Sequence, residues 1–277
     1  MKFSNFVIRT ISGLLFALLV IGSVYLGQIS FAVLMGVILI GSLFEFYRLS
    51  LKVRVRPQMF YGVALGLLLY ITTFLQASGA LDLPIMFYAF VPLSLGVFIV
   101  EMYRNHSRPF TNIAYTLLGV AYIAGPMAMM NYIAFTPSIG GAVYDFRLVM
   151  GFFFLLWAND TGAYLVGMSL GRNKLFPRIS PKKSWEGFIG GVVIAVAVGA
   201  LLSLFFTDYS LNLWISLGFL IAVSGVFGDL VESMYKRSLQ VKDSGNIMPG
   251  HGGFLDRFDA VFFAAPIVFV YLQLIVV

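Results

Sequence analysis

Nine apolar runs, each long enough to cross a lipid bilayer as a helix, divide the sequence and limit what it can fold into. A transmembrane helix needs about 20 consecutive apolar residues, and its backbone polar groups must be paired within the chain. The runs lack the polar–apolar alternation of membrane strands. Only 11% of the residues are charged, against roughly 25% in soluble domains. We therefore predict an all-α polytopic integral membrane helical bundle with about nine transmembrane helices, at residues 10–27, 30–48, 58–76, 84–101, 113–135, 148–169, 187–206, 212–232 and 259–277.

Basic residues are distributed unevenly between the two ends of this predicted bundle. If the N-terminus is cytoplasmic, 17 of the 18 lysines and arginines lie on the cytoplasmic side, and only Arg147 falls in an opposite loop. Cytoplasmic loops carry the excess of Lys and Arg. We therefore expect a cytoplasmic N-terminus and an outside C-terminus, in a bacterial cytoplasmic membrane. A basic segment precedes the first run, as in signal peptides, but no cleavage site follows, so we interpret this run as a retained span.

The polar residues are concentrated in the second half of the chain. We interpret residues 1–277 as a single membrane domain in which spans within 1–135 provide scaffold and lipid contact, and spans within 148–277 carry the functional site. The sequence contains no cysteine, which excludes disulfides, thiolate chemistry and Cys-ligated metals. The basic cluster at 48–56 is typical of membrane topology and anionic-lipid contact.

The most polar stretch, residues 233–259, lies between two apolar runs. It contains four lysines and arginines, three aspartates and one of the two histidines. A second polar loop at 170–186 lies on the same predicted side of the membrane. Chemistry or specific binding is the first interpretation of so much charge in so apolar a chain.

Several carboxylates fall inside predicted spans, where each costs about 2.5–3.5 kcal/mol to insert and therefore needs a reason. Asp229, Glu232, Ser233 and Lys236 have the i, i+3, i+4, i+7 spacing of one helix face, and Asp256 and Asp259 share a face on the next helix. If the faces meet, oxygen ligands converge in a manner suited to Mg²⁺ or Mn²⁺. Ordinary ion pairing, for example of Asp229 with Lys236, is the alternative. Asp160 and Glu45 are further carboxylates inside spans.

Glycines at 249–253 can turn backbone N–H groups toward an anion, which favours a phosphate-binding turn. Lys236, Arg237, Lys242 and Arg257 would neutralise a polyphosphate there. The alternative is a plain turn before a span. Lys182 and Lys183, in the second polar loop, fit phosphate binding and a cytoplasmic topology signal equally well.

Three segments resemble the phosphatidate cytidylyltransferases, the CDP-diacylglycerol synthases. They are the 233–259 pattern, with its Pro-Gly-His-Gly-Gly and Asp-Arg-x-Asp elements, and the Trp-Ala-Asn-Asp-Thr-Gly-Ala-Tyr and Ser-Pro-Lys-Lys-Ser-Trp-Glu-Gly segments upstream. The resemblance implies transfer of CMP from CTP to phosphatidic acid with Mg²⁺, and a second cation is possible. It implies metal ligation by Asp229, Asp256 and Asp259, and nucleotide and phosphate contacts for Ser233, Lys236, Arg237 and the 249–253 turn, which contains His251, Gly252 and Gly253. We expect Lys236 to be catalytic as well. From their charge we add Lys242, Arg257, Lys182, Lys183 and Asp160 as candidate substrate-binding residues.

Two other functions remain open from the sequence. One is a CTP-dependent membrane enzyme with another lipid acceptor, such as an isoprenoid ether lipid phosphate or a polyprenol. The other is a secondary transporter, which intramembrane carboxylates also fit. The expected partners are CTP, phosphatidic acid and bilayer lipids. Nucleic acid is not expected, and a homodimer is possible.

Overall fold

The computed structural model describes residues 5–81, 85–136, 143–241, 243–245 and 252–276. This part of the chain is almost entirely helical. The elements are α1 (Asn5–Leu26), α2 (Gln28–Ser50), η1 (Leu51–Val53), α3 (Met59–Ala77), α4 (Ile85–Arg104), α5 (Pro109–Gly119), η2 (Val120–Ala124), α6 (Gly125–Ala134), α7 (Phe146–Leu170), β1 (Lys174–Phe176), β2 (Ser180–Ser184), α8 (Trp185–Phe205), α9 (Leu211–Ser238) and α10 (Leu255–Val276).

Each predicted span coincides with one helix or one continuous helical segment. Within the described residues, seven of these are long and apolar enough to cross a membrane, and Ile11–Leu26 of α1 is a shorter apolar stretch. The prediction of a polytopic membrane bundle is confirmed. The number of crossings and the sidedness of the termini stay predictions.

The fifth predicted span is built from three pieces that form one helical segment, α5, η2 and α6. Residues Val120–Ala124 form a π-helical turn, directly before Gly125 and Pro126. Pro126 has no N–H group to donate to a carbonyl of the preceding turn, which weakens the regular hydrogen-bond ladder at this point. The π turn thus lies directly before the proline, inside one continuous helical segment.

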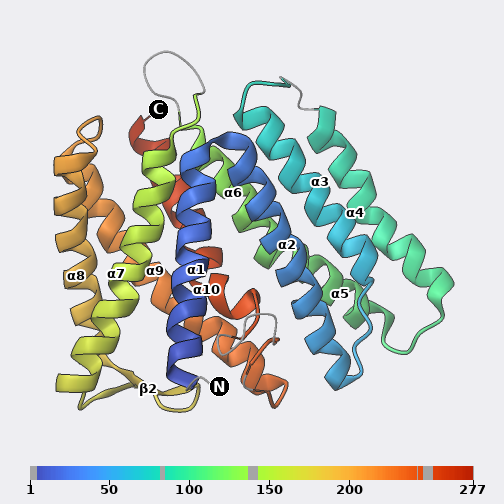
Figure 1. Cartoon of the computed structure of the whole chain (residues 1–277). Coiled ribbons are helices and arrows are strands. Elements are labelled where there is room, and N and C mark those ends of the chain that lie inside the picture. Colours follow the sequence, from blue (N-terminus) through green and yellow to red (C-terminus); the bar gives the residue numbers. More distant parts are fainter. Residues whose placement is uncertain (1–4, 82–84, 137–142, 242, 246–251, 277) are drawn as a thin grey trace.

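The helices alternate in direction, so that all the strongly basic loops lie at one end of the bundle. Figure 1 shows the start of α1 at the same end as β2, and the end of α10 at the opposite end. The start of α7 lies at that opposite end in Figure 1, and Asp145 directly precedes and caps it. Arg147 follows in the first turn of α7, where it pairs with Asp145 at 2.8 Å and also with Asp208.

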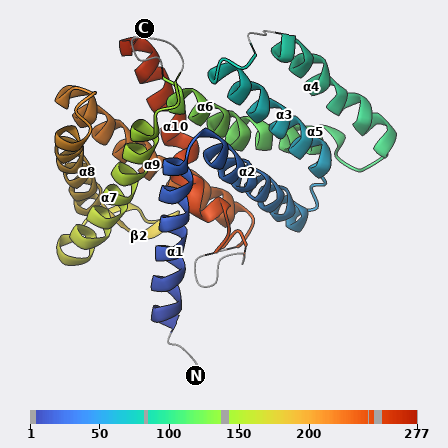
Figure 2. The same cartoon turned by 45° about the horizontal axis from the view of Figure 1, so that its top comes forward.

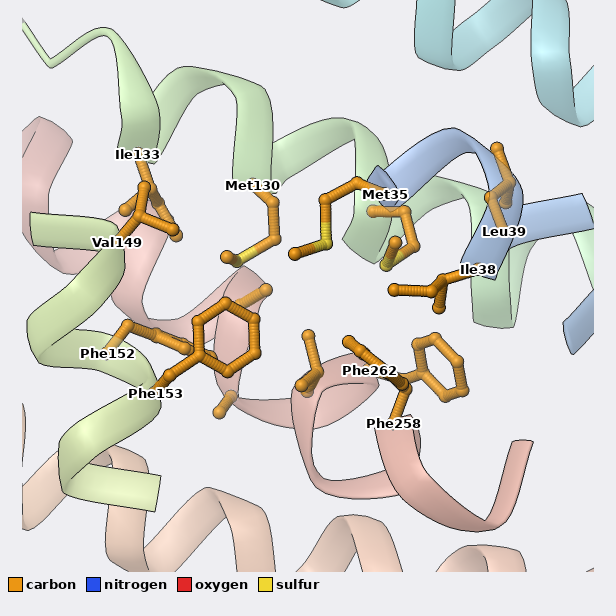
Figure 3. Packing of buried hydrophobic residues seen from close by; sticks show 14 of the residues in the cluster. Met35, Ile38, Leu39, Met130, Ile133, Val149, Phe152, Phe153, Phe258 and Phe262 are labelled. Carbon is orange, nitrogen blue, oxygen red and sulfur yellow. The ribbon is translucent and has the colours of Figure 1, made fainter. Parts of the chain in front are cut away.

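Two groups of helices are visible, and one core joins them. In Figures 1 and 2, α3, α4 and α5 lie on one side of α2, and α7, α8 and α9 lie on the other side, with α1 and α10 between. Figure 3 shows buried side chains of α2, α6, α7 and α10 that face one another in this core. They include Met35, Met130, Phe152, Phe258 and Phe262, each at most 2% exposed. The core fixes α2 against α10 across the middle of the molecule.

The loop between α7 and α8 contains a feature that periodicity did not predict. Its strands β1 and β2 form a two-stranded antiparallel sheet that pairs Lys174 with Ser184 and Phe176 with Ser180. Ser184 then caps α8, since its hydroxyl accepts a hydrogen bond from Gly187 N at 3.2 Å. The second polar loop is therefore a short hairpin anchored at the start of α8.

Helices α9 and α10 cross closely at Gly228. A Cβ atom at this position would lie 2.9 Å from Ala260 Cα and closer still to the carbonyl oxygen of Asp259. Backbone atoms of a neighbouring helix cannot give way as a flexible side chain can. The absence of a side chain at Gly228 thus allows Asp229 and Asp259 to lie on adjoining surfaces.

We expect Gly228→Ala to lower the stability of the purified protein in detergent by about 1–3 kcal/mol, as overpacking typically does. The measurement is thermal unfolding. Gly22→Ala is the matched control, because nothing lies within 4 Å of its added Cβ and alanine is the better helix former. Equal unfolding temperatures for the two variants would show that the α9–α10 crossing is looser than described.

Candidate functional site

A cavity of about 1110 Å³ opens at the end of the bundle that carries the basic loops. Small-molecule sites usually measure about 300–1,000 Å³, so this one has room for more than one small ligand. It lies among α7, the hairpin, α8, α9 and α10. Its charged lining residues are Asp160, Lys174, Lys182, Lys183, Asp229, Lys236, Asp243, Asp256, Arg257 and Asp259.

Three carboxylates meet beside the α9–α10 crossing. One ligand oxygen from each of Asp229, Glu232 and Asp259 lies within 4.8 Å of the other two. Asp229 and Glu232 come from one face of α9, and Asp259 comes from the second turn of α10. The two helix faces therefore meet, and Glu232 joins Asp229 and Asp259 in the cluster.

The donor set of this cluster fits a hard divalent cation. All three groups are carboxylates, which Mg²⁺ and Mn²⁺ accept as ligands. Glu232 is 1% exposed, and its buried Oε1 accepts no hydrogen bond from the described residues. A buried carboxylate oxygen without a partner is unfavourable unless a cation or a proton satisfies it. These three residues could thus hold a metal ion.

Lys236 lies at the centre of a buried ion network. Its Nζ is 2.6 Å from Glu232 Oε2 and 2.6 Å from Asp256 Oδ1. The pairing of Asp229 with Lys236, considered as an alternative to metal binding, is not the arrangement found. Asp229 instead pairs with Lys183 of the hairpin, at 2.5 Å. One cation thus bridges the two helices, and a second reaches the cluster from the hairpin.

Asp256 is held by hydrogen bonds from three sides. Besides Lys236, its Oδ2 accepts from Gly253 N at 2.9 Å and Ser244 N at 3.0 Å, and Ser244 Oγ lies 2.8 Å from it. Gly252 adopts a φ of 83°, and a Cβ there would collide with the Asp256 carboxylate. The described carboxylate cluster contains Glu232 and not Asp256. Metal ligation by Asp256 stays a prediction, while its observed contacts order the chain before α10.

The remaining predicted substrate-binding residues fall into four groups. Ser233 Oγ donates to Asp229 Oδ1 at 3.2 Å, beside the cluster. Arg237 is exposed and donates to Val241 O at 3.1 Å, and it does not line the cavity. Gly252, Arg257, Asp160, Lys182 and Lys183 do line it. Lys242 and His251 lie outside the described residues.

Two carboxylates were noted in the sequence but given no site role. Helical spacing could have assigned Glu232 to the site, since it follows Asp229 at i+3 on the same helix face. No such spacing could have assigned Glu45, because its hydrogen-bond partners lie about 200 residues further along the chain. Asp243 lines the cavity from the loop before α10. Its position there could not be read from helical spacing.

Comparisons with known proteins agree with this arrangement. Residues 7–275 match the model of the cytidylyltransferase family. A protein named phosphatidate cytidylyltransferase from Staphylococcus haemolyticus is 37% identical over 208 residues, which cover 74% of this chain and 76% of the relative. A protein of the same name from Staphylococcus aureus is 44% identical over 175 residues, covering 61% of this chain and 64% of the relative. The match extends over almost every helix described above, and the chain therefore belongs to the cytidylyltransferase family.

Proposed function

We propose that this protein is a CTP:phosphatidate cytidylyltransferase, which forms CDP-diacylglycerol and pyrophosphate. The observation that carries the proposal is the acidic cluster of Asp229, Glu232 and Asp259, of which Asp229 and Asp259 line one large cavity together with basic side chains, at an end of a membrane bundle. Such a site suits a water-soluble nucleotide and a lipid headgroup together. The family match and the names of the relatives support the same reaction.

In the proposed reaction, a phosphate oxygen of phosphatidate attacks the α-phosphorus of CTP. A new phosphorus–oxygen bond forms, and the bond from the α-phosphorus to the bridging oxygen of the β-phosphate breaks. The electron pair leaves with pyrophosphate. The phosphomonoester is already anionic near neutral pH, so the attack needs no strong general base. The barrier lies in bringing two anions together and in stabilising charge on the leaving group.

The chain's own residues address this barrier by charge and position. Lys182, Lys183 and Arg257 line the cavity and would bind phosphate oxygens. Lys236 fixes Glu232 relative to Asp256 through its two ion pairs, which orients the cluster before substrate binds. A divalent cation held by Asp229, Glu232 and Asp259, which we propose to be Mg²⁺, would neutralise charge on both substrates and on pyrophosphate. Metal ligation by Asp256 is also part of the proposal, although Asp256 is not a member of the described carboxylate cluster. Binding of a second cation is a further part of the proposal.

The protein is an integral membrane protein, and we propose that the cavity faces the cytoplasm of a bacterial inner membrane. The basic loops at the cavity end support this orientation, because cytoplasmic loops carry the Lys and Arg excess. CTP would then enter from the cytoplasm, and phosphatidate would keep its acyl chains in the bilayer.

The test is an assay of purified protein in detergent with radiolabelled CTP, phosphatidate and Mg²⁺. Label is expected in the lipid phase, together with stoichiometric pyrophosphate. Parallel reactions with an isoprenoid ether lipid phosphate or a polyprenyl acceptor decide between lipid substrates. Labelled lipid only with one of these acceptors would replace phosphatidate, and no labelled lipid from folded protein with any acceptor would refute the proposal.

We expect Lys183 to leave its ion pair with Asp229 and to bind a phosphate of CTP when the substrate enters. Lys183→Ala should therefore raise the KM for CTP roughly 10- to 100-fold. A hydrogen bond to a charged group contributes about 1.5–3 kcal/mol, and 1.4 kcal/mol corresponds to a factor of ten. The measurement is the initial rate at varied CTP concentration. Arg178→Ala is the control, since Arg178 is exposed on the same hairpin and does not line the cavity. A KM equal to that of the control would show that Lys183 pairs with Asp229 and does not bind CTP.

A further inference from the structure

Glu45 is a buried carboxylate that comes from the N-terminal half of the chain and contacts the site region of the C-terminal half. It lies near the end of α2 and is 6% exposed. A carboxylate in an apolar span is unfavourable unless its oxygens are satisfied. Its hydrogen-bond partners therefore indicate why the position is occupied by glutamate.

Within the described residues, the groups that contact the Glu45 carboxylate belong to the chain just before α10 or at its start. Phe254 N donates to Oε1 at 3.0 Å, and Leu255 N donates to Oε2 at 2.9 Å. Ser244 Oγ lies 2.9 Å from Glu45 Oε2 and 2.8 Å from Asp256 Oδ2, and its single proton is donated to one of the two carboxylates at a time. The first N–H groups of a helix have no intrahelical acceptor, and the positive end of the helix dipole favours an anion there. Glu45 thus caps α10 from a helix about 200 residues earlier in the chain.

Two glycines allow this close approach. A Cβ at Gly245 would lie 2.6 Å from Glu45 Oε1, and a Cβ at Gly253 would overlap both carboxylate oxygens. The segments on either side of residues 246–251 are therefore shaped around one carboxylate. The Glu45 carboxylate contacts both segments.

The contacts of Glu45 lead directly to the acidic cluster. Ser244, whose hydroxyl contacts Glu45, donates its backbone N–H to Asp256 Oδ2, Asp256 pairs with Lys236, and Lys236 pairs with Glu232. A second route is the helix itself. Asp259 is four residues after Leu255, so a shift of the start of α10 moves this member of the cluster.

We propose that Glu45 is a positioning residue for the cytidylyltransferase site, which sets the start of α10 and the 243–245 segment so that the acidic cluster has its cation-binding geometry. This inference rests on the proposed function. It gives α2 a part in catalysis beyond scaffold and lipid contact. Groups that orient metal ligands typically change metal affinity or activity 10- to 100-fold when they are removed.

The first test compares Glu45→Gln with Glu101→Gln. Glu101 is the matched control, because it is 2% exposed in α4 and also accepts from three side chains, those of Gln58, Asn112 and Arg104. A glutamine at 45 places an NH₂ group against at least one of its present donors. We expect Glu45→Gln to raise the Mg²⁺ concentration for half-maximal activity about tenfold or more, and Glu101→Gln to leave it unchanged. A loss of folded protein alone would lower the maximal rate without this shift.

A second readout does not use activity. In metal-free protein, hydrogen exchange of the amides at 253–258 should become faster in Glu45→Gln and stay at the wild-type rate in Glu101→Gln. If Glu45→Gln does not fold, Gly245→Ala provides the test, since it pushes on the same carboxylate without changing charge. Adding Glu45→Asp to Gly245→Ala should then restore part of the Mg²⁺ response, because the shorter side chain leaves room for the new Cβ.

The outcomes separate this inference from the proposed function. A wild-type enzyme that makes labelled lipid, with Glu45→Gln matching Glu101→Gln in Mg²⁺ response and exchange, overturns the role of Glu45. If the effects of Gly245→Ala and Glu45→Asp on the Mg²⁺ response simply add in the double variant, this result also counts against the role of Glu45. A folded wild-type protein that makes no labelled lipid overturns the proposed function instead.

Discussion

Asp259→Asn is expected to lower the cytidylyltransferase rate by roughly 1,000-fold or more. A bound metal ion typically contributes several kcal/mol of charge stabilisation, and each 1.36 kcal/mol is a factor of ten in rate. Asp259 is the member of the cluster that α10 supplies, so asparagine removes the ligand that ties the two helices to one cation. The measurement is label from CTP in the lipid phase, with Asp208→Asn as the control. Asp208 is an exposed carboxylate that pairs with Arg147 at the opposite end of the bundle.

The unfolding temperature, measured with and without Mg²⁺, distinguishes the loss of a metal ligand from a loss of folded protein. Asp229, Glu232 and Asp259 are like charges near one another, and like charges disfavour the ionised state of their neighbours. Asparagine relieves part of that repulsion, so Asp259→Asn should unfold at the wild-type temperature or above it without divalent cation. The stabilisation that Mg²⁺ gives the wild type should be lost in the variant. A near-normal rate, or an undiminished stabilisation by Mg²⁺, would remove Asp259 from the metal site.

Lys236→Met is expected to give the second large effect, on stability and activity together. Methionine keeps most of the length of lysine and removes the cation between Glu232 and Asp256. Removing one partner of a buried ion pair typically costs about 3–5 kcal/mol, because the other charge stays buried without compensation. Thermal unfolding in detergent and the labelled-lipid assay measure the two effects. Lys52→Met, at an exposed position in η1, is the matched control.

A double variant tests the physical reason for this loss. Adding Asp256→Asn to Lys236→Met removes one of the two uncompensated carboxylates. The unfolding temperature should recover in part, while the activity should not, because Glu232 still lacks its cation. Additive losses in the double variant would show that Lys236 and Asp256 do not act as one network.

The helices and one face of the candidate site could be predicted because they depend on local sequence. Apolar runs of sufficient length identify spans, and the spacing of Asp229, Glu232 and Lys236 places them on one face of α9. The observed i, i+4 pair of Glu232 with Lys236 follows from that spacing. The two helix faces meet in the structure, since Asp259 of α10 lies beside Asp229 and Glu232 of α9, and metal binding by these residues stays a prediction.

The partners of these residues across the fold could not be predicted in the same way. Helices in a membrane are apolar on most faces, so hydrophobic periodicity does not say which neighbour a face will contact. The Glu45 contacts, the pair of Lys183 with Asp229, and the hairpin that carries Lys183 all depend on that packing. The roles of Lys242 and His251, which lie outside the described residues, stay predictions.

The ion pair within α9 has a consequence for how the chain is made. Helix α9 leaves the ribosome before α10, so Asp229 and Glu232 enter the membrane before Asp256 and Asp259 are available. Carboxylates in a span hinder insertion, and an opposite charge on the same helix offsets part of this hindrance. Lys236, one turn after Glu232, can neutralise it during insertion without any contact from α10. When α10 is inserted, Asp256 pairs with the same lysine. Lys236 can thus offset the charge of Glu232 during insertion and afterwards bind α10 to α9.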